Sequence, residues 1–171
     1  GVSALPALLR RGDVLVFNDT RVIPAQLEGL RGRETGSVAR IGATLHKRID
    51  LRRWQAFVRN GKRLREGDTI AFPDQVSATA EERHADGSWT LAFAGDEPVE
   101  LLLERAGRMP LPPYIAQRRP ADAADGDDYQ TMFAREKGAV AAPTAALHFT
   151  PALLDALTAA GIGHETLTLH V

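Results

Sequence analysis

The sequence predicts a mixed α/β domain into which a small β-barrel domain is inserted, and three observations support this. Val14–Phe17 is a continuous apolar run between polar residues, which is typical of a strand buried on both faces of an α/β sheet. From residue 24 onward, short alternating segments and frequent turn signals replace such runs, as expected for a small barrel or sandwich. Near the end, Thr150 and Pro151 begin a helix that Gly161 ends, and Thr166–Val171 alternates like a strand.

We assign residues 1–23 and 109–171 to an incomplete α/β domain, and residues 24–108 to the barrel with a closing helix. The expected barrel strands are Ala25–Leu30, Val38–Leu45, Trp54–Arg59, Thr69–Phe72, Val76–Glu81 and Ser88–Phe93. Within the third of these, Trp54 and Phe57 are assigned to one face and Ala56 and Val58 to the other. We therefore expect that strand to be covered on both sides.

The closing helix is predicted from helical spacing. Val99, Leu102 and Leu103 recur at the spacing of one helix face, and Gly107 follows as a stop signal. A second short helix is predicted over Tyr129–Ala134, with Asp127 or Asp128 as its N-cap.

Two further segments have a composition that suits a binding site. Three prolines between Met109 and Ile115 make a stiff, extended stretch, which is either a rigid linker or a wall that displays Tyr114 for stacking. Gly138–Phe149 consists mostly of small residues, which bury little area but allow close approach of the backbone to a ligand. His148 is the one ionisable side chain in that stretch.

Asn18-Asp19-Thr20-Arg21 follows the first predicted strand directly. In open α/β sheets, ligands bind outside the carboxyl ends of the strands, so this corner is a candidate binding site. The alternative is an Asx-type turn that ends the strand and leaves the arginine in solvent.

Composition excludes several classes of site. The 171 residues include no cysteine, so neither a disulfide framework nor a cysteine metal site is possible. No apolar run is long enough to span a bilayer and no signal-peptide pattern occurs, so we expect a cytoplasmic protein without membrane contact. The glycine patterns of dinucleotide and P-loop sites are missing, and the five histidines have no metal-ligand spacing.

The net charge of -1 hides a strong segregation of charge along the chain. Residues 31–65 contain 11 basic residues against two acidic ones, and residues 66–104 contain 10 acidic residues against one basic. A nucleic acid responds to the local charge rather than to the total, so the basic run is a candidate RNA-binding surface. The alternative is a solvated β-rich face.

Four stretches together resemble one known family. They are Gly12–Ala25, Met109–Ile115, Tyr129–Thr131 and Gly138–Phe149, in the family's order. The chain is similar, almost end to end, to the S-adenosylmethionine:tRNA ribosyltransferase-isomerases of queuosine biosynthesis, whose fold is an α/β domain with an inserted β-barrel. It departs from the family pattern at Gln26, where arginine is common, and at Ala146, where glycine is common.

The resemblance implies an enzyme that transfers and isomerises the ribosyl moiety of S-adenosylmethionine onto 7-aminomethyl-7-deazaguanine at the tRNA wobble position. Epoxyqueuosine forms, and adenine and methionine are released. S-adenosylmethionine is consumed as the ribosyl donor, so no cofactor or metal is implied. The expected partners are tRNA and S-adenosylmethionine, and the expected state is a monomer. The family extends beyond both ends of this sequence, so we expect a fragment of a longer protein, whose activity in isolation is not implied.

The resemblance also directs attention to particular residues. Histidine is the usual general base near neutral pH, so His148 is the first candidate catalytic residue, with Asp19 as the second. Tyr114 and Phe149 are candidates to stack on adenine or to face the sulfonium, and Arg21 is a candidate to pair with a carboxylate or phosphate. The other candidate substrate-binding residues are Asn18, Thr20, Tyr129, Gln130, Pro143 and Thr144.

The candidate tRNA-binding residues are Arg52, Arg53, Lys62 and Arg63, from the basic run. A non-catalytic RNA-binding β-barrel module is the alternative function, and it explains the charge segregation and the barrel. The catalytic interpretation requires the corner at residues 18–21, the Tyr114 segment and the His148 segment to meet at one cleft.

Overall fold

The structure is a computed structural model, and it describes residues 1–33, 36–112, 115, 118–119 and 124–169. Its internal contacts divide the chain into two compact units: unit 1 comprises residues 1–22 and 126–171, and unit 2 comprises residues 23–125. The predicted domain boundaries lie after residues 23 and 108, so the second unit boundary lies further along the chain than predicted. No helix in the described ranges is both long and apolar enough to cross a bilayer.

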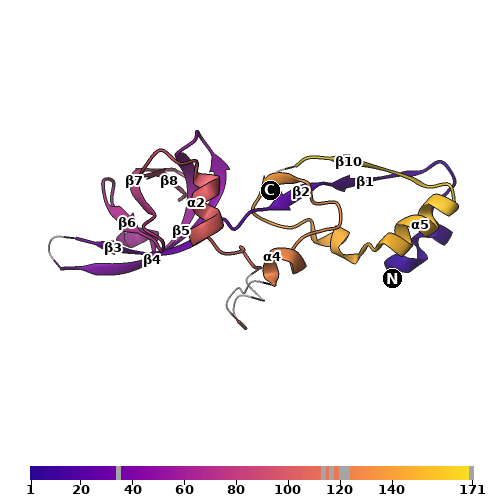
Figure 1. The fold of residues 1–171 in the computed structure, drawn as a ribbon, viewed down its shortest axis with the longest axis horizontal. Helices are drawn as coiled ribbons and strands as arrows, with labels where there is room; N and C mark the ends of the chain where they lie inside the picture. Colours follow the sequence, from indigo (N-terminus) through magenta and orange to yellow (C-terminus); the bar gives the residue numbers. More distant parts are fainter. Residues whose placement is uncertain (34–35, 113–114, 116–117, 120–123, 170–171) are drawn as a thin grey trace. The chain divides into compact units, whose positions relative to one another are not determined.

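Unit 2 contains a closed antiparallel barrel (Figure 1). Its strands, in order around the barrel, are β3 (Gln26–Gly32), β4 (Val38–Arg48), β5 (Arg53–Arg59), β8 (Trp89–Phe93), β7 (Ser77–Arg83) and β6 (Thr69–Ala71). Each strand overlaps one of the six segments predicted from alternation, so the predicted barrel is confirmed. The 3₁₀ helix η2 (Gly61–Arg63) follows β5, and helix α2 (Val99–Ala106) follows β8 and packs against β3.

Large and small apolar side chains fill the barrel interior. The large ones are fully buried, and burial of each contributes about 1.5–3 kcal/mol. They are Leu27, Ile41, Leu45, Ile70 and Leu91, and alanines at 43, 56 and 80 leave room for them. This mixture suits the tapering interior of a small barrel.

The predicted faces of β5 are wrong. Trp54 and Ala56 both point into the barrel, at 4% and 0% exposure, whereas Phe57 lies outside with 52% of its surface exposed. Successive side chains of a strand alternate between faces, so residues three apart cannot share one. The outer face of β5 is therefore open, not covered.

The barrel closes where β6 meets β3. This seam is narrow, because only Leu30 and Arg31 of β3 pair with residues of β6. Gly29 makes the close approach possible: a Cβ at this position would lie 2.6 Å from the carbonyl oxygen of Ala71.

Unit 1 contains two parallel strand pairs and several short helices. β1 (Val14–Asn18) pairs with β10 (Gly163–Leu167), and β2 (Thr20–Val22) pairs with β9 (Glu136–Ala139). The helical segments are η1 (Val2–Ala4), α1 (Leu5–Leu8), η3 (Thr144–His148), α5 (Pro151–Ala159) and α4 (Asp125–Asp128), whose first residue belongs to unit 2. In Figure 1, β1 and β10 run side by side.

The expectation that β1 is buried on both faces is wrong. Phe17 is buried in an apolar cluster that Leu15 also contacts, but Val14 and Val16 are 55% and 58% exposed. Within the described ranges β1 has a single strand neighbour and one covered face. A short run of apolar residues can form a strand with one buried face or a strand with two. The sequence pattern therefore does not indicate how many faces of β1 are buried.

Two of the predicted helices, α2 and α5, are present, and the predicted helix over residues 129–134 is not. Thr150 caps α5 as predicted, because its Oγ1 accepts a hydrogen bond from the backbone N of Leu153 at 3.3 Å. Val99, Leu102 and Leu103 are buried on α2, which confirms that helix. The helix predicted over 129–134 is wrong, since α4 ends at Asp128 and includes the proposed capping residues. The final strand begins at Gly163 rather than at Thr166.

We predict that Gly107→Ala destabilises the barrel by about 1–3 kcal/mol, because added side-chain atoms would overpack a closed space. A Cβ at Gly107 would overlap the carbonyl oxygen of Pro24 and lie 2.5 Å from that of Leu103. Urea unfolding measures the change. Gly32→Ala is the matched control, because a Cβ there has nothing within 4 Å. Equal stability of the two variants would contradict the prediction.

Candidate functional site

The corner between β1 and β2 is held by the side chain of Asn18. Its Nδ2 donates to the carbonyl oxygen of Leu169 at 2.8 Å, and its Oδ1 accepts from the backbone N of Leu169 at 3.1 Å. The same Oδ1 accepts from the backbone N of Thr20 at 3.1 Å, which is an Asx-type turn. The amide therefore acts like one more strand residue and extends the β1–β10 pairing past Leu167.

Asp19 connects all four strands of unit 1 at this corner. Its side chain is buried, and Oδ1 accepts from the hydroxyl of Thr168 at 2.8 Å while Oδ2 accepts from Nη2 of Arg135 at 2.9 Å. Its backbone N donates to Leu167, and its carbonyl oxygen accepts from the backbone N of Arg135 and of Glu136. The hydrogen bond from Thr168, followed by the contact with Arg135, lowers the pKa of Asp19. The carboxylate is therefore ionised at neutral pH.

A cavity of about 310 Å³ lies beside this corner, entirely within unit 1. Its lining residues are Met132, Phe133, Arg135, His164, Glu165 and Thr166. Arg135 Nη2 bridges the carboxylate of Asp19 and the hydroxyl of Thr166 at 2.9 and 2.8 Å. The cavity thus combines the apolar side chains of Met132 and Phe133 with a guanidinium, a carboxylate and an imidazole, which suits a ligand with both a ring and a charged group.

An aromatic cluster connects this cavity to the small-residue segment. Phe17 stacks on Phe133, with ring centroids 4.0 Å apart, and Phe149 meets Phe17 edge-on at 4.8 Å. Phe149 directly follows η3, which ends at His148, so the candidate base lies in the same unit as the corner. His148 is exposed, and its side chain makes no hydrogen bond or ion pair among the described residues.

The motif at Tyr129–Thr131 holds the edge of β2. Gln130 accepts a hydrogen bond from the backbone N of Val22 and donates one to its carbonyl oxygen, both at 2.9 Å. Tyr129 and Thr131 are buried, and the hydroxyls of Thr131 and Thr20 are buried without a partner in the described ranges. An unsatisfied buried hydroxyl costs about 1–3 kcal/mol, so a polar ligand that reached either one would be favoured.

The other sequence-predicted residues differ in position. Pro143 precedes η3 as its N-cap, Thr144 begins η3 in an exposed position, and Arg21 is half-buried on β2. Tyr114 lies outside the described residues, and so the expected meeting of three segments stays a prediction.

Sequence reasoning missed Arg135, His164, Thr166 and Thr168, which contribute to the cavity or to the binding of Asp19. One signal could have found the last two. β1 and β10 are parallel neighbours, so their carboxyl ends lie at the same edge. Asn18-Asp19 is at the end of β1 and Thr166–Thr168 is at the end of β10, so the two segments are expected to lie close together. Arg135 had no such signal, because it precedes β9 outside any predicted strand or helix.

About half of the cations in the basic run of the barrel are paired with acids, most of which are distant in sequence. Asp68 accepts hydrogen bonds from Arg33 at 2.6 and 3.0 Å, and it lies 3.8 Å from Nε of the buried Arg31. The other ion pairs of the run are Arg48–Glu100, Arg52–Asp96, Arg53–Asp50 and Arg59–Glu28. Six of the 11 cations are thus paired.

Five cations of the run form no ion pair within the part of the chain that the structure describes: Arg40, Lys47, Lys62, Arg63 and Arg65. The four candidate tRNA-binding residues fall into two groups at opposite ends of β5. Arg52 and Arg53 are ion-paired near its start, whereas Lys62 and Arg63 are unpaired and exposed on η2. Arg53 binds Asp50 at 2.6 Å, and the backbone N of Arg52 also donates to that carboxylate.

The described residues show no group of three or more His, Asp or Glu side chains placed to hold a metal ion.

Comparisons with known proteins give the family. The family described as "Queuosine biosynthesis protein" matches residues 1–171, which is the whole chain. This chain belongs to the queuosine biosynthesis protein family. The family inferred from the four sequence stretches is thereby confirmed.

Named members of the queuosine biosynthesis protein family are close in sequence. A protein of Sphingopyxis alaskensis named S-adenosylmethionine:tRNA ribosyltransferase-isomerase is 78% identical over 171 residues, which are 100% of this chain and 47% of that protein. A protein of Novosphingobium aromaticivorans with the same name is 74% identical over 170 residues, 99% of this chain and 48% of its own length. The chain therefore spans about half the length of the curated relatives it matches.

A solved structure of S-adenosylmethionine tRNA ribosyltransferase from Thermotoga maritima is 25% identical to this chain. Its TM-score is 0.42, and the match covers 99% of this chain and 44% of that one.

We predict that Asp68→Asn lowers the free energy of unfolding by about 1.5–3 kcal/mol at pH 7, the usual range for hydrogen bonds to a charged group. The hydrogen bond from Arg33 is the main cause that lowers the pKa of Asp68 below 3.8. The ionised carboxylate therefore stabilises the fold above about pH 4, and this contribution is lost as the pH falls through the folded-state pKa.

Urea unfolding at several pH values between 7 and 3 measures the difference between wild type and variant, which should shrink on acidification. Asp74→Asn is the matched control, because Asp74 is exposed and makes no ion pair in the described ranges. A difference that stays constant down to pH 3 would contradict the role assigned to Asp68.

Proposed function

We propose that the protein containing this chain transfers and isomerises the ribosyl moiety of S-adenosylmethionine onto 7-aminomethyl-7-deazaguanine at the tRNA wobble position. Epoxyqueuosine is formed in the tRNA, and adenine and methionine are released. The observation that carries the proposal is 78% identity, over the whole chain, to a protein named for this activity. S-adenosylmethionine is consumed as the ribosyl donor, so the proposal includes no cofactor and no metal. We also propose that the protein is a cytoplasmic monomer.

The two parallel strand pairs and helices of unit 1 are proposed to be part of one mixed α/β domain in the full-length protein. Support comes from the parallel pairing itself, since parallel strands need crossover connections and all-parallel sheets occur almost only in α/β folds. The exposed Val14 and Val16 would be buried in such a domain.

The proposed reaction needs a base that removes a proton, either from the incoming amine or from the carbon next to the sulfonium. His148 is proposed for this role, because it is exposed and no described residue engages its ring. Phe149, beside it, offers an aromatic face to adenine or to the sulfonium. Asp19 is proposed to act together with Arg135, since both oxygens of its carboxylate already accept hydrogen bonds.

The remaining proposed contacts to substrate are Asn18, Thr20, Arg21, Tyr114, Tyr129, Gln130, Pro143 and Thr144. Arg21 is half-buried and makes no ion pair in the described ranges, which leaves it available to the methionine carboxylate. Thr20 and Tyr129 are buried, so they are proposed to shape the site rather than to reach solvent.

Release of free adenine tests the proposed activity. Full-length protein mixed with S-adenosylmethionine and tRNA carrying 7-aminomethyl-7-deazaguanine should yield adenine and methionine, detected by chromatography. S-adenosylhomocysteine in place of adenine would indicate a methyltransferase, and no consumption of S-adenosylmethionine would support a binding module. Either result would contradict the proposal.

We predict that His148→Ala lowers kcat by about 10²- to 10⁴-fold, the usual contribution of a general base, with an unchanged unfolding curve. His164→Ala is the comparison, because His164 lines the cavity beside Arg135 but is not the proposed base. A loss confined to His164→Ala would move the base to that residue, and normal rates in His148→Ala would remove His148 from the mechanism.

Salt dependence tests the barrel as the tRNA-binding surface. Each cation that contacts a phosphate adds close to one unit to the slope of log K against log salt, so Lys62→Ala with Arg63→Ala should lower the slope by about 1–2. Arg52→Ala with Arg53→Ala should lower it less, because both side chains already bind acids. Equal slopes for wild type and the Lys62/Arg63 variant would exclude η2 from the tRNA contact.

A further inference from the structure

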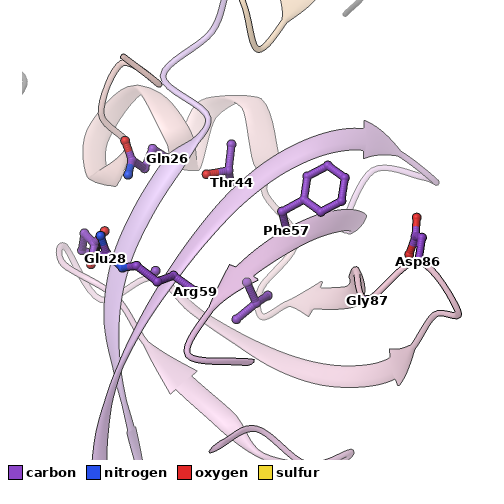
Figure 2. A pocket seen from close by; sticks show the side chains of 9 residues that line it. Gln26, Glu28, Thr44, Phe57, Arg59, Asp86 and Gly87 are labelled. Atoms are coloured by element: carbon purple, nitrogen blue, oxygen red, sulfur yellow. Dashed lines mark hydrogen bonds and ion pairs between the residues drawn. The ribbon is translucent and has the colours of Figure 1, made fainter. Parts of the chain in front are cut away.

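A second cavity lies on the outer face of the barrel, across β3, β4 and β5 and the turn between β7 and β8. Its volume is about 360 Å³. Its lining residues are Gln26, Glu28, Gly42, Thr44, Phe57, Val58, Arg59, Asp86 and Gly87 (Figure 2). All of these residues belong to unit 2, so this barrel groove is a feature of the barrel itself.

Gly42 forms the floor of the barrel groove. It lies in the middle of β4, between Glu28 of β3 and Arg59 of β5. Arg59 Nη2 donates to both carboxylate oxygens of Glu28 at 2.7 Å, so the ion pair crosses over this glycine. A Cβ at Gly42 would lie 2.9 Å from the carboxylate and 3.2 Å from the guanidinium, so a larger residue would displace the pair and fill the groove.

Phe57 presents a rigid aromatic surface in the barrel groove. One side of its ring stacks on His46, with ring centroids 4.2 Å apart and an interplanar angle of 19°. Yet 52% of Phe57 remains exposed, so the ring that His46 holds in place still presents surface to a ligand. Burial lowers the pKa of His46, so its imidazole is neutral at pH 7 and the pair remains uncharged.

Hydrogen-bonding groups surround the exposed ring. Thr44 is paired with Phe57 across β4 and β5, and Figure 2 shows Gln26 and Asp86 at the border of the same groove. Asp86 Oδ1 accepts from the hydroxyl of Ser88 at 2.7 Å, which lowers the pKa of Asp86 and keeps it ionised. Its Oδ2 accepts no hydrogen bond from the described residues, so an acceptor is free at the border of the groove.

Basic side chains without an ion pair in the described ranges lie next to the Arg59 end of the barrel groove. Arg59 is followed by Asn60, whose side chain donates to the carbonyl oxygen of Arg40 at 3.1 Å, and then by η2. Arg40, Lys62 and Arg63 are exposed there and form no ion pair with described residues. Aromatic stacking surfaces beside positive charge are the combination by which proteins hold single-stranded nucleic acid.

We propose that the barrel groove binds one unpaired nucleobase of an RNA, stacked on Phe57, while the cations around η2 contact the adjoining phosphates. A carboxylate accepts hydrogen bonds from amino groups on a base edge, so Asp86 favours the amino-bearing bases cytosine, guanine and adenine over uracil. The proposal rests on the proposed function only in taking RNA as the partner, and it assigns to the barrel a contact separate from the cavity of unit 1.

Fluorescence anisotropy with the full-length protein tests this directly. The probes are fluorescein-labelled single-stranded RNA hexamers, one of cytidine and one of uridine. Phe57→Ala should weaken cytidine-hexamer binding by about 5- to 100-fold, the range expected for loss of one base stack, and Phe57→Tyr should restore it. Leu30→Ala is the matched control, because Leu30 is 50% exposed on β3 but does not line the groove.

Asp86→Asn tests the base preference, and it should reduce the ratio of cytidine- to uridine-hexamer affinity. Unchanged cytidine-hexamer affinity in Phe57→Ala would overturn the proposal, as would equal weakening by Leu30→Ala. Self-association of the protein that Phe57→Ala abolishes, without a change in RNA affinity, would identify the groove as a contact between copies and also overturn it. Adenine release, measured separately at saturating tRNA, shows whether the proposed activity fails independently of the groove.

Discussion

The buried carboxylate of Asp19 is the interaction on which the arrangement of unit 1 depends. Through its side chain and backbone it contacts residues at or near the ends of β9 and β10, while it lies between β1 and β2. Removing a charge from water is costly unless hydrogen bonds replace the lost hydration, and here Thr168 and Arg135 supply them. The same arginine lines the cavity together with Glu165, so the group that stabilises the corner also contributes a positive charge to the cavity.

Local patterns predicted the barrel well and unit 1 less well, for a physical reason. Alternation of apolar and polar residues with a period of two indicates that a segment is a strand and which of its faces is buried. Turn residues mark the ends of each strand, so all six barrel strands could be located from the sequence. Val14–Phe17 carries no such alternation, and its number of covered faces depends on which segments pack against it. Arg135 shows the same limit for the site: its partner Asp19 is 116 residues away, and only the folded chain brings them together.

The segregation of charge along the sequence overstates the number of basic side chains that are unpaired in the folded barrel. The acidic run forms β6, β7, β8 and α2 of the same unit, so contacts such as Arg33–Asp68 and Arg48–Glu100 pair cations that appear free in the linear sequence. What remains is a smaller group of unpaired cations, concentrated around η2 and the adjoining part of β4. The electrostatic field of the barrel is therefore more local than the 11 basic residues of the run would indicate.

The short pairing between β3 and β6 has a consequence for the motions of the barrel. Every other strand junction is longer, so the least costly way to interrupt the cylinder is to separate these two strands while the remaining ladder stays intact. Arg31, near the end of β3, and Arg33, directly after it, form ion pairs with Asp68, the residue before β6. These ion pairs join the two strands at the short junction and therefore stabilise it. Local opening of the barrel would begin at this junction when the ion pairs break.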